Sequence, residues 1–323
     1  MNTISEAQAL SNQHLSLLLA YLMRQNYQFI TISPSSHEKV NSRPENAHAN
    51  DLEGVFGWNR LFNAETVDEF VFELIQSTDL AVKVKNAWKS QYRVSSINQQ
   101  LFLHSAYPTL QNDAVFFGPD TYRFVGALQH FLALNRQPII RAVDIGTGSG
   151  AGAVVLALAL PQCEIIAVDI NETALRLAQI NINAADIDNV RLVKSDLLND
   201  VQGNFDLIIA NPPYLLDESE REYRHGGGHL GAQLSVQIVD TAITRLNPQG
   251  ALLLYTGVAI VDGNDAFLAE ITAKLNRAGF AFEYTEIDPD IFGEELVNAA
   301  YSHVDRIAAV VLIARKPAKY IPI

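Results

Sequence analysis

The chain has 323 residues, and its 36 Asp and Glu outnumber 23 Lys and Arg, which gives a formal net charge of -13 at pH 7. This acidic balance does not support broad electrostatic binding of nucleic acid. Cys163 is the single cysteine, which excludes an intramolecular disulfide and a cysteine metal cluster. The length suggests two domains, or one large domain with an extension.

The first residues lack the basic, apolar and small-residue succession that is typical of a signal peptide. The longest apolar run, residues 151–160, is about half as long as a membrane-spanning helix requires. We therefore expect a soluble, cytoplasmic protein that has no membrane partner.

The first part of the chain begins with a helix signal and continues into a polar stretch. Residues 5–29 predict an amphipathic helix with Leu10, Leu17 and Leu18 near one face. Residues 30–50 are polar and contain two prolines, which indicates a loop.

A second helix and a β ribbon follow. Residues 64–77 predict a helix that is capped near Asn63. Short strands are predicted at residues 92–94, 100–104 and 114–117. We expect residues 1–117 to form an N-terminal substrate-recognition region of helices followed by a β ribbon. A structural cap or a dimer surface would fit the same pattern.

The turn Gly118-Pro119-Asp120-Thr121 leads into a predicted helix over residues 121–134. Asp120 or Thr121 can cap this helix, which would explain both residues without any function. The functional interpretation is that the turn lies across a bound cofactor, because it comes just ahead of the next motif.

That motif is a glycine-rich turn after a short apolar strand that starts at Ile139. The turn reads Val143-Asp144-Ile145-Gly146-Thr147-Gly148-Ser149-Gly150 and leads into a helix rich in alanine, valine and leucine. Glycines allow a tight turn and let a ligand approach the backbone closely. The sequence therefore predicts a ligand site at this turn.

Acidic residues stand at the ends of three successive predicted strands. Asp144 precedes the glycine turn, where it can meet an ammonium group. Asp169 ends the strand at residues 165–169, where a carboxylate can accept both hydroxyls of a ribose. Asp196 ends the next strand, where an adenine amino group can donate to it. Three such acids suit S-adenosylmethionine, which is cationic at sulfur and carries an ammonium.

A nicotinamide dinucleotide is the alternative cofactor. Gly146, Gly148 and Ala151 also satisfy the dinucleotide fingerprint. Asp144 argues against this alternative, since its carboxylate would lie close to a pyrophosphate.

Asn211-Pro212-Pro213-Tyr214 closes an apolar strand at residues 205–210. Two prolines cannot continue a strand ladder, and a residue before proline is held extended. The turn therefore offers an amide oxygen at Asn211, a carbonyl at Pro212 and an aromatic face at Tyr214. Two acceptors side by side suit a target NH2 group, and the aromatic ring can stack on a planar amide or base. A stiff loop without function is the alternative interpretation.

These motifs together resemble class I S-adenosylmethionine-dependent methyltransferases. Within that superfamily the chain is similar to the HemK-like glutamine N5-methyltransferases, which modify peptide release factors or a ribosomal protein. The turn at residues 118–121 is similar to the Pro-Glu/Asp-Thr element of that branch. The resemblance spans about residues 117–316, and Asn-Pro-Pro-Tyr is shared with nucleic-acid amino-methyltransferases.

The resemblance implies roles for individual residues. The residues implied for cofactor binding are Asp144, Gly146, Thr147, Gly148, Gly150, Asp169, Ile170, Asp196, Leu197 and Asn211. The residues implied for catalysis are Asn211, Pro212 and Tyr214. The residues implied for substrate binding are Pro213, Tyr214, Asp120 and Thr121. No metal site is expected.

Two segments depart from the pattern of that branch. Residues 218–224 are charged, where the branch has an acidic-proline segment, and the first 115 residues do not resemble its small helical bundle. His225 and His229 flank three glycines, which disfavour the helix that a metal-binding pair at this spacing would need. The segment is either a flexible loop or a lid over the acceptor.

The remaining apolar segments complete an α/β fold. They are a helix at 234–246, a strand at 251–255, a helix at 263–278 and strands at 280–287 and 307–314. The last two fit the antiparallel edge that the superfamily adds. We expect residues 118–323 to form a Rossmann-like methyltransferase domain with a mostly parallel sheet.

The reaction implied is methyl transfer from S-adenosylmethionine to a planar nitrogen. The leading acceptor is a glutamine side-chain amide of a translation protein, either a release factor or a ribosomal protein. The alternatives are an exocyclic base amine of rRNA or DNA, which residues 1–115 would grip, and a catalytically silent cofactor-binding module.

Overall fold

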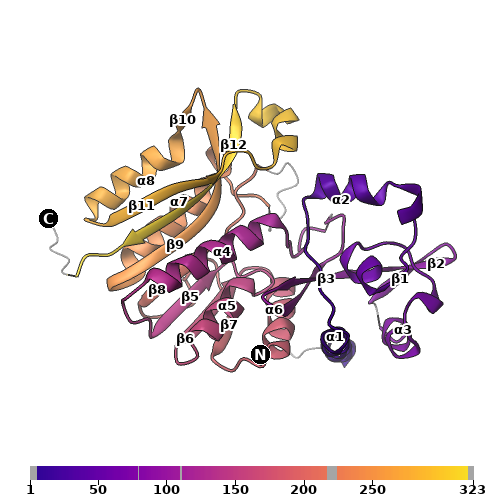
Figure 1. The fold of residues 1–323 in the computed structure, drawn as a ribbon. Coiled ribbons are helices and arrows are strands. Elements are labelled where there is room, and N and C mark those ends of the chain that lie inside the picture. The colour runs from indigo at the N-terminus through magenta and orange to yellow at the C-terminus, as the bar shows by residue number, and fades with distance from the viewer. Residues whose placement is uncertain (1–5, 79, 110, 217–223, 319–323) are drawn as a thin grey trace.

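A computed structural model describes residues 6–78, 80–109, 111–216 and 224–318. A sheet of eight strands forms its centre (Figure 1). The strands are β5 (Arg141–Ile145), β6 (Glu164–Asp169), β7 (Val190–Lys194), β8 (Phe205–Ala210), β9 (Leu246–Val261), β10 (Asn264–Asp265), β11 (Ala281–Asp288) and β12 (Arg306–Arg315).

Seven of these strands lie in the order β11-β12-β9-β8-β5-β6-β7, and β10 pairs with the end of β9. The five strands β9, β8, β5, β6 and β7 run parallel to one another. β12 runs antiparallel to both β9 and β11. The expected mostly parallel α/β sheet with an antiparallel strand near one edge is therefore confirmed. The antiparallel strand lies one position inside the edge.

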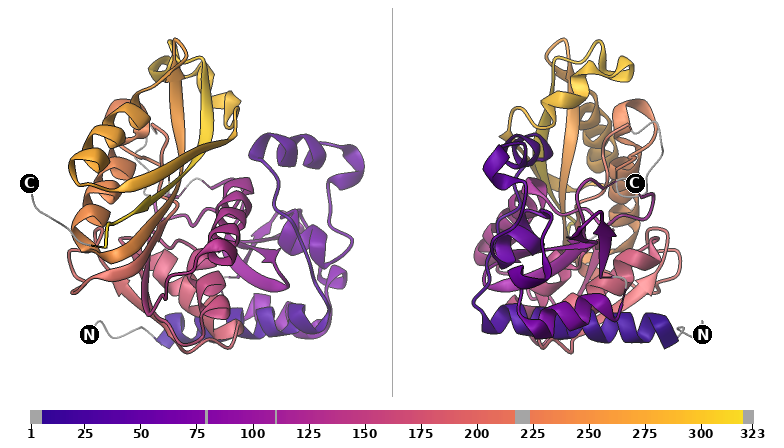
Figure 2. Two further views of the ribbon diagram at one scale, coloured as in Figure 1. Left: turned by 60° about the vertical axis from the view of Figure 1, so that its left-hand side comes forward. Right: turned by 90° about the vertical axis from the view of Figure 1, so that its right-hand side faces the viewer.

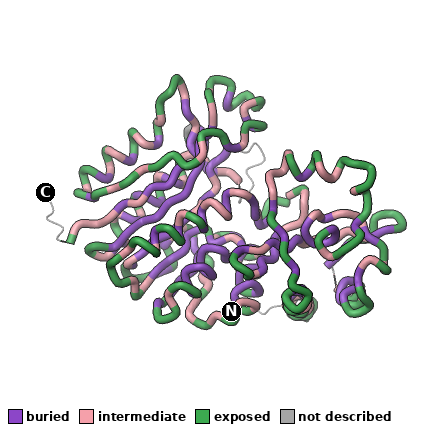
Figure 3. The backbone as a smooth tube through the Cα atoms, in the orientation of Figure 1, coloured by how far each residue is buried: buried purple, intermediate pink, exposed green. Residues whose placement is uncertain are grey.

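Five helices cover the two faces of this sheet (Figure 1, Figure 2). On one face lie α4 (Pro119–Leu134), α5 (Ala151–Ala159) and α6 (Glu172–Ala184), and on the other lie α7 (Gln233–Arg245) and α8 (Ala266–Arg277). In β8, Leu207 and Ile209 belong to the apolar core under α4, α5 and α6, whereas Ile208 belongs to the core under α7 and α8. Residues 207–210 of β8 form an apolar run, because a central parallel strand is buried on both faces. Figure 3 shows this burial along the centre of the sheet.

The N-terminal part packs beside α6. It contains α1 (Glu6–Arg24), α2 (Pro34–Asn41), α3 (Glu69–Gln76) and two hairpins, β1 (Ala81–Val84) with β2 (Ala87–Ser90) and β3 (Tyr92–Ile97) with β4 (Gln100–Ser105). Its apolar core includes Ala174, Leu177 and Ile180 of α6. On the same helix the buried Asn181 amide accepts from Leu103 N at 2.8 Å and donates to Ser149 O at 2.9 Å.

Short helical turns connect these elements. The 3₁₀ turns are Pro44–Asn46, Ala64–Thr66, His229–Gly231, Gly293–Val297 and Ala299–Tyr301, and Glu53–Gly57 is a π turn. Within the residue ranges that the structure describes, no helix is long and apolar enough to cross a bilayer.

Several predicted N-terminal elements differ from the structure. The predicted loop at residues 30–50 contains α2, which Ser33 caps by accepting from Ser36 N. α1 ends at Arg24, because Asn26 has a positive φ of 53°. The predicted apolar face of α1 is partly correct, since Leu18 is buried but Leu10 and Leu17 are exposed.

The second predicted helix and the ribbon are partly correct. α3 starts later than expected, because Asp68 rather than Asn63 caps it, with Oδ1 accepting from Val71 N at 3.0 Å. The strands predicted at 92–94 and 100–104 are confirmed as β3 and β4. Residues 114–117 are not a strand, although Val115 N bonds to Ser105 Oγ.

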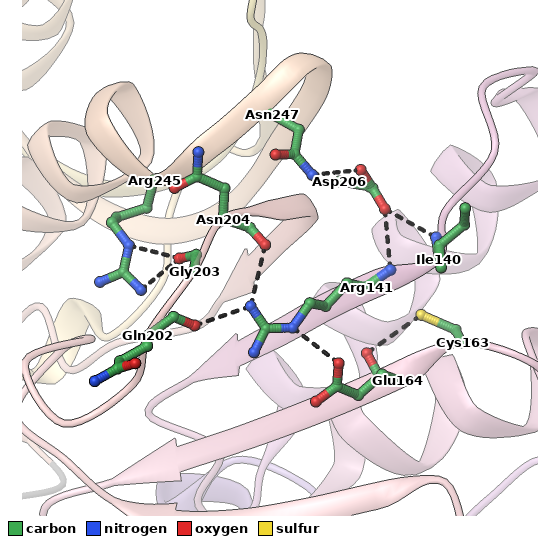
Figure 4. A network of polar contacts seen from close by, with 10 residues as sticks. All are labelled: Ile140, Arg141, Cys163, Glu164, Gln202, Gly203, Asn204, Asp206, Arg245 and Asn247. Carbon is green, nitrogen blue, oxygen red and sulfur yellow. Dashed lines mark hydrogen bonds and ion pairs between the residues drawn. The ribbon is translucent and has the colours of Figure 1, made fainter.

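Polar contacts hold the amino-terminal ends of the sheet strands together (Figure 4). Arg141 at the start of β5 donates to Glu164 at 2.9 Å and to the carbonyl of Gln202 at 2.9 Å. Asp206 accepts from the backbone N–H of Arg141 at 3.0 Å. Arg245 donates to the carbonyl of Gly203. The contacts at this end of the sheet therefore stabilise the fold, and the opposite end carries the candidate site.

Candidate active site

The strand register brings the predicted motifs to one edge of the sheet. Ile145 pairs with Val168 of β6 and with Ala210 of β8, so Gly146, Asp169 and Asn211 each follow a paired residue. The carboxyl ends of parallel strands meet at such an edge, where open α/β folds bind their ligands.

A cavity of about 210 Å³ opens at this edge. Fourteen of the fifteen sequence-predicted site residues line it: Asp120, Thr121, Asp144, Gly146, Thr147, Gly148, Asp169, Ile170, Asp196, Leu197, Asn211, Pro212, Pro213 and Tyr214. Gly150 does not line it. Its backbone lies at the N-terminal end of α5 with a positive φ of 82°, and a side chain there would press on Ala178 at 3.2 Å.

The glycine turn is held by the acid that ends β6. Asp169 Oδ2 accepts from Gly148 N at 2.9 Å, and Asp169 Oδ1 accepts from Asn171 N at 3.0 Å. Gly148 has a positive φ of 55°, which an L side chain adopts with strain. The carboxylate therefore shapes the turn and also lies in the cavity wall, where a ligand hydroxyl can reach it.

Asp144 is buried beneath the same turn. Its Oδ2 accepts from Thr147 Oγ1 at 2.7 Å and from Ala153 N at 3.0 Å. Within the part of the chain that the structure describes, Oδ1 accepts no hydrogen bond. Burial raises the pKa of Asp144 to about 7, because the ionised form loses its hydration. A cationic ligand beside this carboxylate would offset that loss.

Asn211 and Pro212 stand at the end of β8 in the cavity wall. Asn211 is half-buried, and its amide makes no hydrogen bond with any residue of the described ranges. A polar amide beside a cavity with its hydrogen-bonding capacity unused is suited to hold a ligand.

Tyr214 is buried and lines the cavity, as does the Asp120 carboxylate. Burial raises the pKa of Tyr214 well above its ordinary value, and the negative charge of Asp120 adds to this. Tyr255, in the middle of β9, donates its hydroxyl to the Asp120 carboxylate. Burial raises the pKa of Asp120, although the hydrogen bonds from Tyr255 and Arg123 act in the opposite direction.

The Tyr214 ring fits closely among its neighbours. A Cβ at Gly257 would lie 2.4 Å from two ring carbons, so only glycine leaves room for the ring at this position of β9. Phe292, from the connection between β11 and β12, meets the ring edge-on with centroids 6.0 Å apart. The Tyr214 ring is therefore held between Gly257 and Phe292.

The glycine segment after His225 is fastened to the same turn. His225 bridges Leu215, and Gly226 N donates to Leu215 O at 2.8 Å. A Cβ at Gly231 would lie 2.2 Å from Tyr214 O. A lid moving here would first have to break these contacts. Most of the charged segment predicted at 218–224 lies outside the described residues.

Sequence reasoning missed three residues of the cavity surroundings. Tyr255 is the last residue of the strand predicted at 251–255, and its place near the ligand-bearing edge could have drawn attention to it. Arg224 lines the cavity and pairs with Glu295. Phe292 gave no local signal, because its position depends on a long connection that folds back over the sheet end.

Comparison with known proteins adds to this geometry. Residues 128–260 match the family described as methyltransferase small domain. The chain is similar to a release factor glutamine methyltransferase of Deinococcus radiodurans, with 36% identity over 165 residues, which is 48% of this chain and 55% of that protein. It is also similar to a ribosomal protein uL3 glutamine methyltransferase of Neisseria meningitidis, with 38% identity over 127 residues, which is 36% of this chain and 42% of that protein.

Among solved structures, the chain is similar to a methyltransferase from Pyrococcus furiosus, with 24% identity and a TM-score of 0.44. The superposition covers 65% of this chain and 91% of that chain. The chain spans about half the length of the curated relatives it matches. The resemblance drawn from the motifs is confirmed for the matched part: residues 128–260 match the methyltransferase small domain, and the chain is similar to glutamine methyltransferases.

Proposed function

We propose that this protein transfers a methyl group from S-adenosylmethionine to a glutamine side-chain amide of a translation protein. The observation that carries the proposal is that Asn211 and Tyr214 share one cavity with the glycine turn, Asp144 and Asp169. The similarity to a release factor glutamine methyltransferase and to a ribosomal protein uL3 glutamine methyltransferase supports this acceptor. Such partners would place the activity in the cytoplasm.

The cavity wall fits this cofactor part by part. Asp144 Oδ1, which accepts no hydrogen bond from the described residues, can meet the ammonium of the methionine moiety. Asp169 lies in the cavity wall, where its carboxylate can accept from ribose hydroxyls. Asp196 is exposed at the rim, where it can accept from an adenine amino group. Thr147, Ile170 and Leu197 complete the contact surface.

The chemistry asks mainly for orientation. Bound S-adenosylmethionine supplies a methyl group that its sulfonium already activates. An amide nitrogen is a poor nucleophile, because its lone pair is delocalised. Asn211 Oδ1 and the Pro212 carbonyl would accept the two amide hydrogens and fix the nitrogen for in-line attack. Pro213 and Tyr214 would support the planar amide, and the buried setting would exclude water.

We further propose a division of roles along the chain. Residues 118–323 would bind cofactor and carry out transfer. Residues 1–117 would recognise the protein that presents the glutamine. The position of the N-terminal part beside α6 and the start of α4 supports this, because the cavity wall includes Ala114, Val115 and Phe116 from its last segment.

Cofactor affinity should rise as the pH increases to about 7 and then level off. Without cofactor, the folded chain keeps the Asp144 proton up to about pH 7, whereas the unfolded carboxyl loses it near 3.8. Between about pH 3.8 and 7, the protonation of Asp144 therefore makes a contribution to folding stability that is lost as the pH rises. A bound ammonium stabilises the ionised carboxylate, so binding releases a proton and strengthens up to about tenfold per pH unit below the pKa. Calorimetry from pH 5.5 to 8.5 measures this. The Asp144→Asn variant should bind weakly with a flat profile, and an equally steep profile in that variant would contradict the assignment.

A labelled-methyl experiment tests the acceptor class. Purified protein and S-adenosylmethionine labelled in the methyl group are added to an extract from cells that lack this protein. The products are then digested separately with protease and nuclease. Label lost to protease and retained through nuclease supports a protein acceptor, which mass spectrometry then locates on a glutamine. Label lost to nuclease points to an exocyclic base amine instead. Cofactor binding without any transfer points to a silent binding module.

A further inference from the structure

Arg60, in the N-terminal part, is a cation that the fold holds in place without pairing its charge. Its Nε donates to Asn41 Oδ1 at 2.9 Å, and its guanidinium carbon lies 5.1 Å from the centre of the Trp58 ring. The two terminal nitrogens of Arg60 make no hydrogen bond or ion pair with the described residues. A guanidinium that is held in this way, with its two outer nitrogens unused, is suited to bind a carboxylate.

Asn41 fixes Arg60 because its own amide is fully engaged. It lies in α2, and its Nδ2 donates to Trp58 O at 2.9 Å and to His37 Nε2 at 2.9 Å. Oδ1 is therefore the atom that accepts from Arg60. The His37 ring is confined in turn, since its centroid lies 5.6 Å from that of Trp58 and 4.6 Å from that of Tyr107. The fold alone thus orients the guanidinium of Arg60.

Arg93 of β3 adds a second cation without a counter-ion. It is only 5% exposed, and its guanidinium donates to two neutral oxygen atoms but to no carboxylate of the described residues. Its guanidinium carbon lies 5.7 Å from the centre of the Phe29 ring, which meets the Trp58 ring edge-on at 5.4 Å. Burying a charge without a partner costs free energy, which a bound anion would offset.

The pKa of His37 supports a concentration of positive charge here. Burial lowers that pKa to about 4, with smaller contributions from the positive charges of Arg93, Lys89 and Arg60. Lys89, in β2, makes no hydrogen bond or ion pair with the residues that the structure describes.

The surrounding charges favour a single carboxylate over a phosphate backbone. Exposed acids follow the same stretch of chain, namely Glu38, Glu45, Asp51 and Glu53. These acids and the net charge of -13 would repel an extended polyanion. One carboxylate of an otherwise mixed protein surface can still meet the two outer nitrogens of Arg60.

Hydrogen bonds connect this region to the wall of the catalytic cavity. Arg93 Nη2 donates to Thr31 Oγ1 at 3.3 Å, and Thr31 N donates to the Tyr122 hydroxyl at 3.0 Å. Tyr122 comes directly after Asp120 and Thr121, which line the cavity. A protein that is bound at this region would therefore lie against the part of the chain that joins the start of α4.

We propose that Arg60 binds a carboxylate of the acceptor protein through its two terminal nitrogens. An acidic segment of that protein would dock on the N-terminal part while its glutamine enters the cavity. This inference rests on the proposed function and names the partner chemistry that residues 1–117 recognise.

Fluorescence anisotropy of a labelled hexaglutamate peptide tests the site without any reaction. The whole protein is titrated into the peptide at low salt, and labelled hexauridylate is the nucleic-acid probe. We expect Arg60→Gln to weaken peptide affinity by about ten- to a hundredfold, the range for losing a hydrogen bond to a charged group. Arg60→Lys should also weaken it, because an ammonium lacks the planar fork. Unchanged affinity in these variants, or no binding of the peptide, overturns the proposal. Tighter Arg60-dependent binding of hexauridylate also overturns it, because the site would then take a phosphate backbone.

The matched control is Arg315→Gln. Arg315 of β12 also lies over an aromatic ring, 5.1 Å from the centre of Phe131, and donates to Asn135 Oδ1 at 3.1 Å. It belongs to the methyltransferase part, so its replacement should leave peptide affinity unchanged. An equal loss of affinity in this variant would show that the peptide responds only to net charge, and would contradict the role of Arg60.

A second measurement uses methyl transfer to the identified acceptor. Arg60→Gln should raise KM for the acceptor by about tenfold, with kcat and cofactor affinity unchanged, because Arg60 does not line the cavity. An unchanged KM would contradict docking at Arg60 and leave the proposed function intact. If no acceptor is found, the proposed function fails, yet the peptide titration still decides whether Arg60 binds a carboxylate.

Discussion

Replacing Asn211 by alanine is expected to lower methyl-transfer turnover by about a hundredfold or more, the scale for losing one oriented polar group in an active site. Asn211 has no hydrogen-bond partner within the described ranges and faces the cavity. Its removal therefore takes away a group reserved for a ligand and leaves no buried partner unsatisfied, so folding stability should change little.

Cofactor affinity should stay close to that of the unchanged protein, because Asp144 and Asp169 remain in place. Turnover is measured with saturating cofactor and the identified acceptor, and affinity by calorimetry. Asn276→Ala is the matched control, since Asn276 is an exposed residue of α8 remote from the cavity. Turnover of Asn211→Ala equal to that of the control would exclude the proposed acceptor pair. Lost cofactor affinity would instead make Asn211 a cofactor ligand first.

Replacing Gly257 by alanine is expected to lower turnover by about ten- to a hundredfold, the range that a displacement of about 1 Å can produce. The new Cβ would lie 2.4 Å from the Tyr214 ring, so the ring must move. Crowding in a packed region also destabilises, here by about 1–3 kcal/mol. The cofactor-binding residues are on other strands and should keep their affinity.

Gly126→Ala is the control for this change. Gly126 is in α4, and a Cβ there meets nothing within 4 Å. Alanine is also the better helix former, so this variant should be at least as stable as the unchanged protein and equally active. Turnover and thermal unfolding are measured for both variants. Full activity in a stable Gly257→Ala protein would show that the position of Tyr214 does not matter for transfer.

The parallel sheet and most of the cavity could be predicted from sequence because their signals are local. Asp144, Asp169 and Asn211 each follow an apolar run, and parallel strands bring their ends to one edge automatically. The glycine turn is also a local signal, since its conformation depends on residues adjacent in the chain.

The contacts around Tyr214 could not be predicted because they join distant segments. Asp120 and Tyr255 are 135 residues apart in the chain, and neither position alone indicates the other. The position of Phe292 depends on how the connection after β11 packs. The helix α2 was missed for a simpler reason. Its Ser33-Pro34 start is a recognisable helix signal, but the polar composition after it favoured a loop.

The packing of α6 has a consequence for any attempt to divide the protein. Ala174, Leu177 and Ile180 are covered by the N-terminal core, and Asn181 completes the backbone hydrogen bonding of β4. A fragment that starts at residue 118 would expose this apolar stripe to water and leave the Asn181 amide without Leu103. The two parts therefore form a single folding unit, even if recognition and transfer are separate tasks. A truncated chain would lose solubility, so its activity would not report on substrate specificity.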